Sequence, residues 1–412
     1  MSSTSTSCGA PPLSLRAILR RSGSTNAGNT VKQPGVHASV WRFPPTSRQE
    51  QAIEAPGKIR VAVNGYGVIG KRVADAVARQ SDMDLVGVAD IAVDWRAHVV
   101  LQRGFRLFGA TAEHATAMRD GGLEVSGELS DLLAGADIVV DCTPKKVAAV
   151  NIEAYRRANR KFVLQGGEKH EATGHSFVAE ASYAGAIGRA STRVVSCNTT
   201  SIVRTLGALK RAGLLKRARG TLLRRATDPG ESHLGGIMNT LAPEPEIPSH
   251  QGPDAKTVDP DLDVVTMAVK VPETLGHVHY WSVQMTRAAS KAEVLKALHA
   301  SSRLILVRMD EGLDAINLVK EWMADLGRPR GDLYEVAIWE DMLTVQGEEV
   351  FFAYMVDNQA IVIPETIDAI RALDGRERDA AASIAQTNAS LGIGSDSLRA
   401  HRIALVRDPT PR

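Results

Sequence analysis

The chain has 412 residues, of which 44% are hydrophobic and 23% charged, and its formal net charge is +2. This length exceeds what one compact core usually takes, so we expect a globular protein of two domains. No apolar run approaches the roughly 20 residues of a membrane span, and we expect no membrane partner. The three cysteines are few enough to fit a reducing compartment.

Basic residues are concentrated at the amino terminus. Residues 1–49 hold six basic residues and no acidic one, which leaves 43 basic against 47 acidic residues, about −4, in the remainder. This balance argues against a nucleic-acid partner. Residues 1–57 lack periodicity and are rich in Ser, Thr, Pro, Gly and Arg, which predicts a disordered extension, either a transit peptide or the product of a mis-called start. We expect a cytoplasmic protein, or an organellar one if the transit peptide is genuine.

Residues 58–196 are expected to form the first domain. Short apolar runs alternate with segments of helical spacing, a pattern typical of a doubly wound parallel sheet of the Rossmann type. Strands are predicted at 58–64, 84–90, 137–141, 161–165 and 193–196, and helices at 68–79, 146–160 and 200–212.

The turn after the first strand reads Asn64-Gly-Tyr-Gly-Val-Ile-Gly70, which contains Gly-x-Gly-x-x-Gly. In this motif Gly65 permits a tight turn, Gly67 lets the backbone approach a pyrophosphate, and Gly70 allows the helix to pack closely on the strand. The N–H groups at the start of the following helix can bind phosphate oxygens. The turn therefore predicts a dinucleotide site.

The second predicted strand ends at Asp90, twenty residues after Gly70. A carboxylate at this place accepts hydrogen bonds from the adenosine ribose hydroxyls and would repel a 2′-phosphate. We therefore expect NAD to be preferred over NADP. The alternative is that Asp90 faces solvent at a strand end.

Cys197 lies where a β-rich run passes into a helical pattern, in Ser196-Cys-Asn-Thr-Thr200. A helix N-terminus favours thiolate, although a lone free cysteine is more often a buried apolar side chain. Beside a nucleotide site, such a thiol suggests aldehyde oxidation through a thioester. We interpret Cys142 as structural. Cys8 lies in the extension, and no cysteine pair has zinc-ligand spacing, so neither metal nor disulfide is expected.

The pattern changes in residues 197–356, the expected catalytic domain. Longer strands at 263–271 and 277–285 predict an α+β fold with a mainly antiparallel sheet. The basic stretch 210–225 is read as a solvated helix followed by a strand, with Arg224 and Arg225 as possible anion ligands. Further helices are predicted at 291–301, 313–326 and 364–373, residues 357–395 are expected to pack back on the first domain, and 396–412 form a tail.

From about Ile59 to about Ile393 the motifs resemble the archaeal-type, or type II, phosphorylating glyceraldehyde-3-phosphate dehydrogenases. The resemblance implies conversion of D-glyceraldehyde 3-phosphate, with inorganic phosphate, to 1,3-bisphosphoglycerate in glycolysis or gluconeogenesis, and a homotetramer. It rests on Val63-Asn-Gly-Tyr-Gly67, Asp141-Cys-Thr-Pro144, Gln165-Gly-Gly-Glu-Lys-His170, Ser196-Cys-Asn-Thr-Thr200, Pro248-Ser-His250 with Gly252-Pro-Asp254, and Thr266-Met-Ala-Val269.

The resemblance makes Cys197 the nucleophile and places His277 at the catalytic histidine of the family. With an ordinary pKa of about 6.5, a histidine can take a proton near neutral pH, and we expect His277 to accept the hydroxyl proton during hydride transfer. His279 is the competing choice. If residues 275–285 form a strand, the side chains of His277 and His279 share one face, so periodicity does not separate them.

The resemblance also assigns binding residues, with three departures. Asp90 replaces a lysine that is common in the family. Gln251 replaces one of two phosphate-binding histidines, and its amide can donate a hydrogen bond but carries no charge. Asn358, with Gln359 beside it, replaces a glutamine that contacts the cofactor. The cofactor-contacting positions are Gly65, Gly67, Val68, Ile69, Gly70, Asp90, Gly167, Arg224 and Asn358. Ser196, Cys197 and Asn198 match the run that contacts the aldehyde, and His250 and Gln251 match the phosphate pair.

Other readings of the sequence remain open. Two anion sites are required, and Arg225 and the hydroxyls of Thr199 and Thr200 are further candidates, with a solvent-facing or helix-capping role as the alternative for the threonines. An aspartate-semialdehyde dehydrogenase-like enzyme would share the nucleotide domain, cysteine and histidine. A non-catalytic nucleotide-sensing protein would keep the fold without the chemistry.

Overall fold

The computed structural model describes residues 57–394 except 145, 166 and 227–240. Apart from Gly57, the predicted extension lies outside the described residues, as does the predicted tail at 396–412. Within the described part, no helix is both long and apolar enough to cross a membrane.

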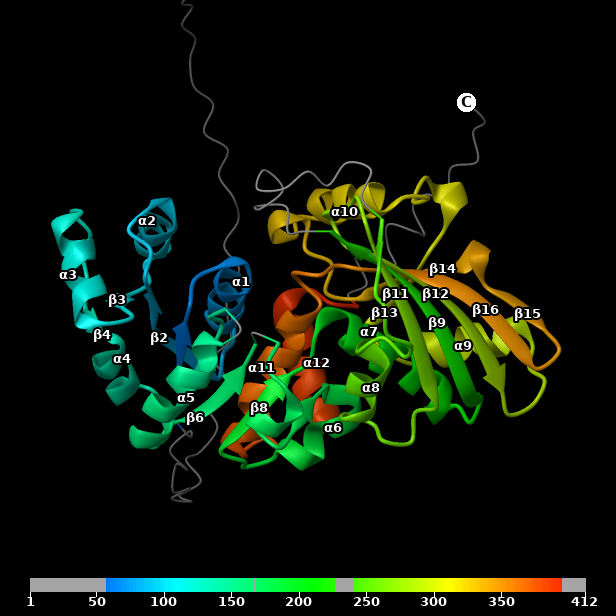
Figure 1. Cartoon of the computed structure of the whole chain (residues 1–412), viewed down its shortest axis with the longest axis horizontal. Coiled ribbons are helices and arrows are strands. Elements are labelled where there is room, and N and C mark those ends of the chain that lie inside the picture. Colours follow the sequence, from blue (N-terminus) through cyan, green and yellow to red (C-terminus); the bar gives the residue numbers. More distant parts are fainter. Residues whose placement is uncertain (1–56, 145, 166, 227–240, 395–412) are drawn as a thin grey trace, which may run out of the picture. The chain divides into compact units, whose positions relative to one another are not determined.

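The first sheet has eight strands that pair only in parallel, in the order β4-β3-β2-β1-β5-β6-β8-β7 (Figure 1). The predicted parallel sheet is confirmed, although three of its strands were not predicted because each has only two or three residues. The strands are β1 (Ile59–Asn64), β2 (Met83–Asp90), β3 (Leu107–Gly109), β4 (Gly127–Glu128), β5 (Ile138–Asp141), β6 (Lys161–Leu164), β7 (Ser176–Phe177) and β8 (Ser191–Val194).

Apolar side chains cover both faces of this sheet. In β1, Val61 and Val63 pack in one hydrophobic cluster and Ala62 in another, because successive side chains of a strand point to opposite faces. A parallel sheet buried in this way reads as a continuous apolar run, which is why its longer strands could be predicted. The helices of this region are α1 (Val68–Val77), α2 (Trp95–Gln102), α3 (Ala112–Asp120), α4 (Leu129–Gly135), α5 (Val147–Arg157) and α6 (Ala179–Ala186).

Helix α7 (Cys197–Arg211) connects the first sheet to the second and begins three residues before the predicted start. The cause is an N-cap: the hydroxyl of Ser196 accepts a hydrogen bond from the N–H of Thr199 at 3.3 Å. Residues 198–209 of α7 are all buried. This central helix therefore holds its first residue, Cys197, in a fixed place.

The second sheet has the strand order β10-β11-β9-β12-β16-β14-β13, with β15 paired to β16. Two neighbouring pairs, β11 with β9 and β13 with β14, are parallel and the other pairs are antiparallel, which confirms the predicted mainly antiparallel sheet. The strands are β9 (Leu215–Arg225), β10 (Ala242–Pro243), β11 (Val264–Val271), β12 (His277–Met285), β13 (Leu304–Val307), β14 (Val336–Trp339), β15 (Thr344–Gln346) and β16 (Glu349–Val356).

The chain then returns to the first sheet. Helix α11 (Val362–Asp374) contacts β5, β6, β8, α1 and α6, and Ile363, Ile367 and Ile370 join the hydrophobic cluster that contains Val61 (Figure 1). The remaining helices are α8 (Gln251–Lys256), α9 (Lys291–His299), α10 (Ile316–Asp325) and α12 (Ala380–Leu391).

A buried charge network ties α11 to α7 and to Arg303, the residue before β13. The Glu365 carboxylate accepts hydrogen bonds from Nε of Arg204 at 2.9 Å and from Nη1 of Arg303 at 3.0 Å. Arg303 also pairs with Asp368 at 2.5 Å, and all four side chains are fully buried. Charges in such a place are tolerated because each has a hydrogen-bonded partner of opposite sign.

Candidate functional site

Cys197 faces a histidine of the second sheet. Its Sγ lies 3.3 Å from Nε2 of His277, the first residue of β12. Burial raises the pKa of the Cys197 thiol, whereas Arg225, a hydrogen bond from the backbone N–H of Asn198, and Arg224 all act to lower it. These groups favour the ionised form, but they do not outweigh burial and the nearby Asp357, so the pKa of the thiol stays above its ordinary value.

The tautomer of His277 follows from its second contact. Its Nδ1 accepts a hydrogen bond from the backbone N–H of Arg225 at 3.1 Å, so the proton of the neutral ring sits on Nε2 and points to the sulfur. Burial lowers the pKa of His277 well below its ordinary value, and the neighbouring His279, Arg225 and Arg224 lower it further. The proton-acceptor role expected from the sequence is not the one this arrangement supports, because the nitrogen that faces the thiol is a donor.

His279 shares the inward face of β12 with His277, as the strand periodicity predicted, but it does not bond the sulfur. Its ring is fully buried, with Nε2 at 2.8 Å from Oδ1 of Asn198 and Nδ1 at 2.9 Å from the hydroxyl of Tyr354. Of the two histidines, His277 is the one that is hydrogen-bonded to Cys197. The structure thus separates two histidines that the sequence left equivalent.

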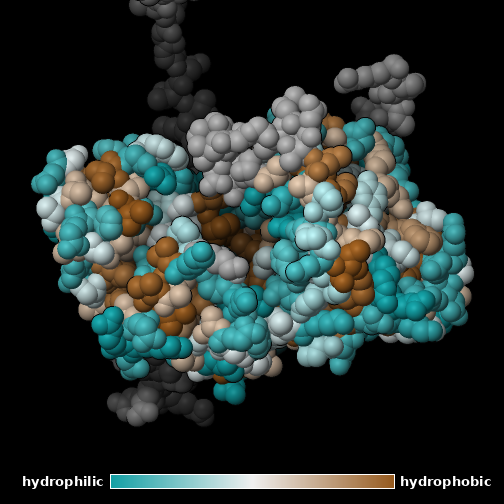
Figure 2. Space-filling model, in the orientation of Figure 1, coloured by the Kyte–Doolittle hydropathy of each residue, from teal (hydrophilic) through white to brown (hydrophobic). Residues whose placement is uncertain are grey.

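A cavity of about 220 Å³ opens beside the thiol. Its walls combine the start of α1 with the start of α7 and the segment after β16, three places far apart in the sequence. The surface drawn in Figure 2 is hollowed near its middle, and the walls of that hollow are largely hydrophobic. The residues that line the cavity are Val68, Ile69, Gln165, Gly167, Val194, Val195, Ser196, Cys197, Arg225, Asn358, Gln359 and Val362.

Three predicted cofactor glycines have the expected geometry. Gly65 has a φ of +95°, and a Cβ there would come within 2.9 Å of the Cys142 backbone; a Cβ on Gly70 would lie 1.8 Å from the carbonyl oxygen of Gly65. By contrast, a Cβ on Gly67 would meet nothing within 4 Å, and no side chain caps α1 there. The open backbone at this helix start suits the pyrophosphate of a dinucleotide.

Asp90 is bound to the same turn. One carboxylate oxygen accepts from the N–H of Tyr66 at 2.5 Å, and the other accepts from the N–H groups of Ile91 and Ala92, both at 2.8 Å. The carboxylate is therefore oriented by the backbone rather than directed freely into solvent. Such fixation suits recognition of ribose hydroxyls, which donate to a carboxylate.

The side chains of the two consecutive residues predicted to bind the substrate phosphate lie in different surroundings. His250 is largely exposed, with Nδ1 at 3.4 Å from the carboxylate of Glu244, which also pairs with Arg224. The side chain of Gln251 is fully buried, and neither of its amide atoms has a hydrogen-bond partner among the described residues. No sequence motif pointed to Glu244, since it lies in an irregular proline-rich stretch.

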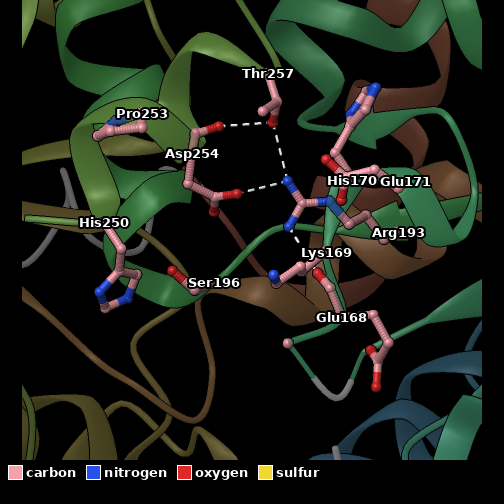
Figure 3. Close-up of a pocket in the computed structure, with 11 residues that line it drawn as sticks. Glu168, Lys169, His170, Glu171, Arg193, Ser196, His250, Pro253, Asp254 and Thr257 are labelled. Atoms are coloured by element: carbon pink, nitrogen blue, oxygen red, sulfur yellow. Dashed lines mark hydrogen bonds and ion pairs between the residues drawn. The ribbon is translucent and has the colours of Figure 1, made fainter. Parts of the chain in front are cut away.

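A second cavity, of about 620 Å³, reaches Ser196 and His250. In Figure 3 the guanidinium of Arg193 lies near its wall, where Arg193 donates to Asp254 at 2.5 Å and to the Thr257 hydroxyl at 2.9 Å. Arg193 is thus engaged within the protein. The other potentially cationic groups in this wall are Lys169, His170 and His250.

Thr199 and Thr200, which were candidates for phosphate binding, are fully buried. The Thr199 hydroxyl donates to Asp254 at 2.8 Å, and that of Thr200 donates to the carbonyl oxygen of Val195 at 3.3 Å. Both hydroxyls are therefore engaged within the protein. Neither threonine faces solvent, and the N-cap of α7 is Ser196, so the solvent-facing and capping alternatives do not describe them either. Among the described residues there is also no cluster of three groups suited to hold a metal ion.

Comparisons with known proteins agree with this arrangement. Residues 196–318 match the model of the glyceraldehyde 3-phosphate dehydrogenase C-terminal domain, and residues 59–171 match that of the dihydrodipicolinate reductase N-terminus. The chain is 45% identical to glyceraldehyde-3-phosphate dehydrogenase of Archaeoglobus fulgidus, with 82% of this chain and 98% of the relative covered. It is 44% identical to that of Methanococcoides burtonii (82% and 99% covered) and 42% identical to that of Methanobrevibacter smithii (81% and 99%). A chain with these relatives and this site belongs to the glyceraldehyde-3-phosphate dehydrogenase family.

Proposed function

We propose that this protein oxidises D-glyceraldehyde 3-phosphate to 1,3-bisphosphoglycerate through a thioester on Cys197, with NAD and inorganic phosphate as co-substrates, in glycolysis or gluconeogenesis. The observation that carries the proposal is the 3.3 Å contact between Sγ of Cys197 and Nε2 of His277 at a cavity shared with the cofactor turn. A thiolate, a fixed donor beside it and a dinucleotide turn are the parts that aldehyde oxidation through a covalent intermediate needs.

In the first step the Cys197 thiol loses its proton to solvent, the thiolate sulfur gives an electron pair to the aldehyde carbon, and the carbonyl π bond opens to an oxygen anion. Nε2–H of His277, which donates to the sulfur before the reaction, then donates to this oxygen. When bound, NAD supplies the acceptor for the hydride that leaves the same carbon. The carbonyl re-forms as a thioester, so no base is required at His277.

The second step transfers the acyl group. An oxygen of inorganic phosphate attacks the thioester carbon, and the carbon–sulfur bond breaks to release the acyl phosphate and the Cys197 thiolate. The exposed His250 and the cavity-lining Arg225 are the side chains we propose for anion binding. Gln251 and Arg224 would contribute only after side-chain rearrangement, since Gln251 is buried and Arg224 is paired with Glu244.

The preference for NAD rests on Asp90, whose carboxylate is held at the cofactor turn. We further propose that Val68, Ile69 and Gly167 contact the nicotinamide half and that Asn358, with Gln359 beside it, binds the carboxamide, because all five line the cavity at Cys197. We also propose that the protein is a cytoplasmic homotetramer. Its nucleotide domain would comprise residues 58–196 together with 357–395, and its catalytic domain residues 197–356.

The test is an NADH-formation assay with glyceraldehyde 3-phosphate in the presence and absence of phosphate or arsenate. We expect steady turnover with either anion, a stoichiometric burst without them, and no burst in Cys197→Ser. Turnover that ignores both anions would indicate a non-phosphorylating enzyme. Preference for aspartate semialdehyde would favour that dehydrogenase, and nucleotide binding without an acyl-enzyme would favour a sensing protein.

A further inference from the structure

A buried series of polar side chains runs from the second sheet to the residue after the nucleophile. Tyr354 of β16 contacts His279 of β12, with ring centroids 4.9 Å apart, and His279 contacts the side chain of Asn198 in α7. The side chains of His279 and Tyr354 are fully buried and that of Asn198 nearly so. None of these contacts is explained by the reaction steps assigned to Cys197 and His277.

The protonation state of His279 determines the direction of these hydrogen bonds. Burial, with Arg224 nearby, lowers the pKa of His279 to about 3, so the ring is neutral and has one N–H. Oδ1 of Asn198 can only accept, which places this proton on Nε2 and makes Nδ1 the acceptor of the Tyr354 hydroxyl. The amide of Asn198 is therefore held with Oδ1 toward His279.

The other end of that amide, Nδ2, is a donor. Asn198 directly follows the nucleophile in α7, and its backbone N–H acts to lower the pKa of Cys197. Its Nδ2 makes no hydrogen bond recorded among the described residues, and it is not one of their fully buried unpaired atoms. Within this part of the chain, Nδ2 thus remains available to a ligand.

We propose that His279 is a positioning residue: by accepting from Tyr354 and donating to Oδ1 of Asn198, it directs Nδ2 of Asn198 to the substrate oxygen that becomes an anion when Cys197 attacks. This inference rests on the proposed function. Without the constraint the amide could invert, and Oδ1 would then face a negatively charged oxygen. A single donor to such an oxygen typically contributes about 100- to 1,000-fold in kcat.

Two amide variants of different length separate this role from a general structural one. In His279→Gln the side-chain amide nitrogen can reach the place of Nε2 and donate to Asn198, whereas in His279→Asn the shorter amide stays near the place of Nδ1. Both remove the ring and leave a buried amide. We expect single-turnover NADH formation to fall less than 10-fold in His279→Gln and roughly 100-fold in His279→Asn, with KM nearly unchanged.

A double-mutant cycle then asks whether His279 acts through Asn198. Asn198→Ala should lose about as much rate as His279→Asn, and the double variant should be no slower than Asn198→Ala alone, because both changes remove one interaction. Alkylation of Cys197 by iodoacetamide should keep its wild-type rate in both His279 variants, since the sulfur displaces iodide from a saturated carbon and no oxygen anion forms.

The outcomes distinguish the proposed function from the positioning role of His279. Absence of an NADH burst in the wild-type protein would overturn the proposed function itself. A wild-type burst with equal rates in the two His279 variants, with multiplicative losses in the double variant, or with slowed alkylation, would overturn the positioning role while leaving the proposed function intact.

Discussion

The backbone N–H of Arg225 donates to Nδ1 of His277 at 3.1 Å, and this bond determines what the opposite side of the ring can do. Because Nδ1 accepts, Nε2 carries the proton that faces Cys197. The histidine beside the nucleophile is thereby set as a donor in its neutral state.

A first prediction follows for His277 variants. His277→Gln retains a donor amide at about the place of Nε2 and should lower kcat about 10-fold, whereas His277→Ala should lower it at least about 100-fold. Pre-steady-state NADH formation measures both. Equal losses in the two variants would show that the histidine works by exchanging a proton, which an amide cannot replace.

A second prediction concerns pH. The pKa of Cys197 is raised by burial and that of His277 is lowered well below its ordinary value, so only the thiol gains charge as pH rises from 5 to 9. The rate of alkylation by iodoacetamide should increase throughout this range with no step near pH 6.5. A plateau beginning near pH 6.5 would instead indicate an ion pair with protonated His277.

Arg225 offers a matched test of that electrostatic balance. Its positive charge acts to lower the pKa of Cys197, so Arg225→Gln should raise this pKa and slow alkylation at pH 7.5 while keeping the backbone bond to His277. Arg219→Gln, on the same strand but paired with Asp263, is the control and should leave the rate unchanged. If both variants react at the wild-type rate, the charge of Arg225 does not affect the pKa of Cys197.

Cofactor choice gives a third prediction. Asp90→Ser removes the carboxylate expected to repel a 2′-phosphate, and the ratio of kcat/KM for NADP to that for NAD should rise at least about 10-fold. Asp94→Ser, which changes a nearby carboxylate paired with Arg96, should shift the ratio little. An unchanged ratio in Asp90→Ser would remove the basis for the NAD assignment.

Stability gives a fourth prediction. Burial acts to raise the pKa of Glu365, but Arg204 and Arg303 outweigh it and lower this pKa below the ordinary value. Glu365→Gln leaves two buried arginines without their shared carboxylate and should cost about 3–5 kcal/mol in free energy of unfolding. Guanidinium unfolding measures this, with the exposed pair partner Glu153→Gln expected to cost less than about 1 kcal/mol.

The same pKa shift gives the sign of the pH effect. A carboxylate whose pKa is lower in the folded than in the unfolded state adds stability above the unfolded pKa of about 4.3, and this contribution is lost as pH falls through the folded pKa. The difference in stability between wild type and Glu365→Gln should therefore shrink in acid. A constant difference down to acid unfolding would contradict the coupling.

Much of this architecture could be predicted because the responsible signals are local. The glycine turn, the apolar runs of β1 and β2 and the thiol before a helical pattern each occupy a few consecutive residues. The early start of α7 could have been read from Ser196 as an N-cap. The two-residue strands β4 and β7 could not, since segments so short carry no periodicity.

The rest of the site depends on contacts between distant segments. His277 and His279 have equivalent patterns, and only the packing of β12 against α7 decides that one bonds Sγ and the other Asn198. Likewise, burial of Gln251 and the pairing of Glu244 with Arg224 arise from tertiary structure. Sequence identifies the chemistry of such residues but not which neighbour each will have.

The return of α11 to the first sheet has a consequence for synthesis. Its isoleucines complete the hydrophobic cluster around Val61, yet they are translated some 300 residues later, after the whole second sheet. Although α1 packs on the same face, the amino-terminal sheet thus leaves the ribosome with part of that apolar face uncovered until the end of the chain is made. We expect the two sheets to mature as one unit rather than in order of translation, which is the usual course for successive domains.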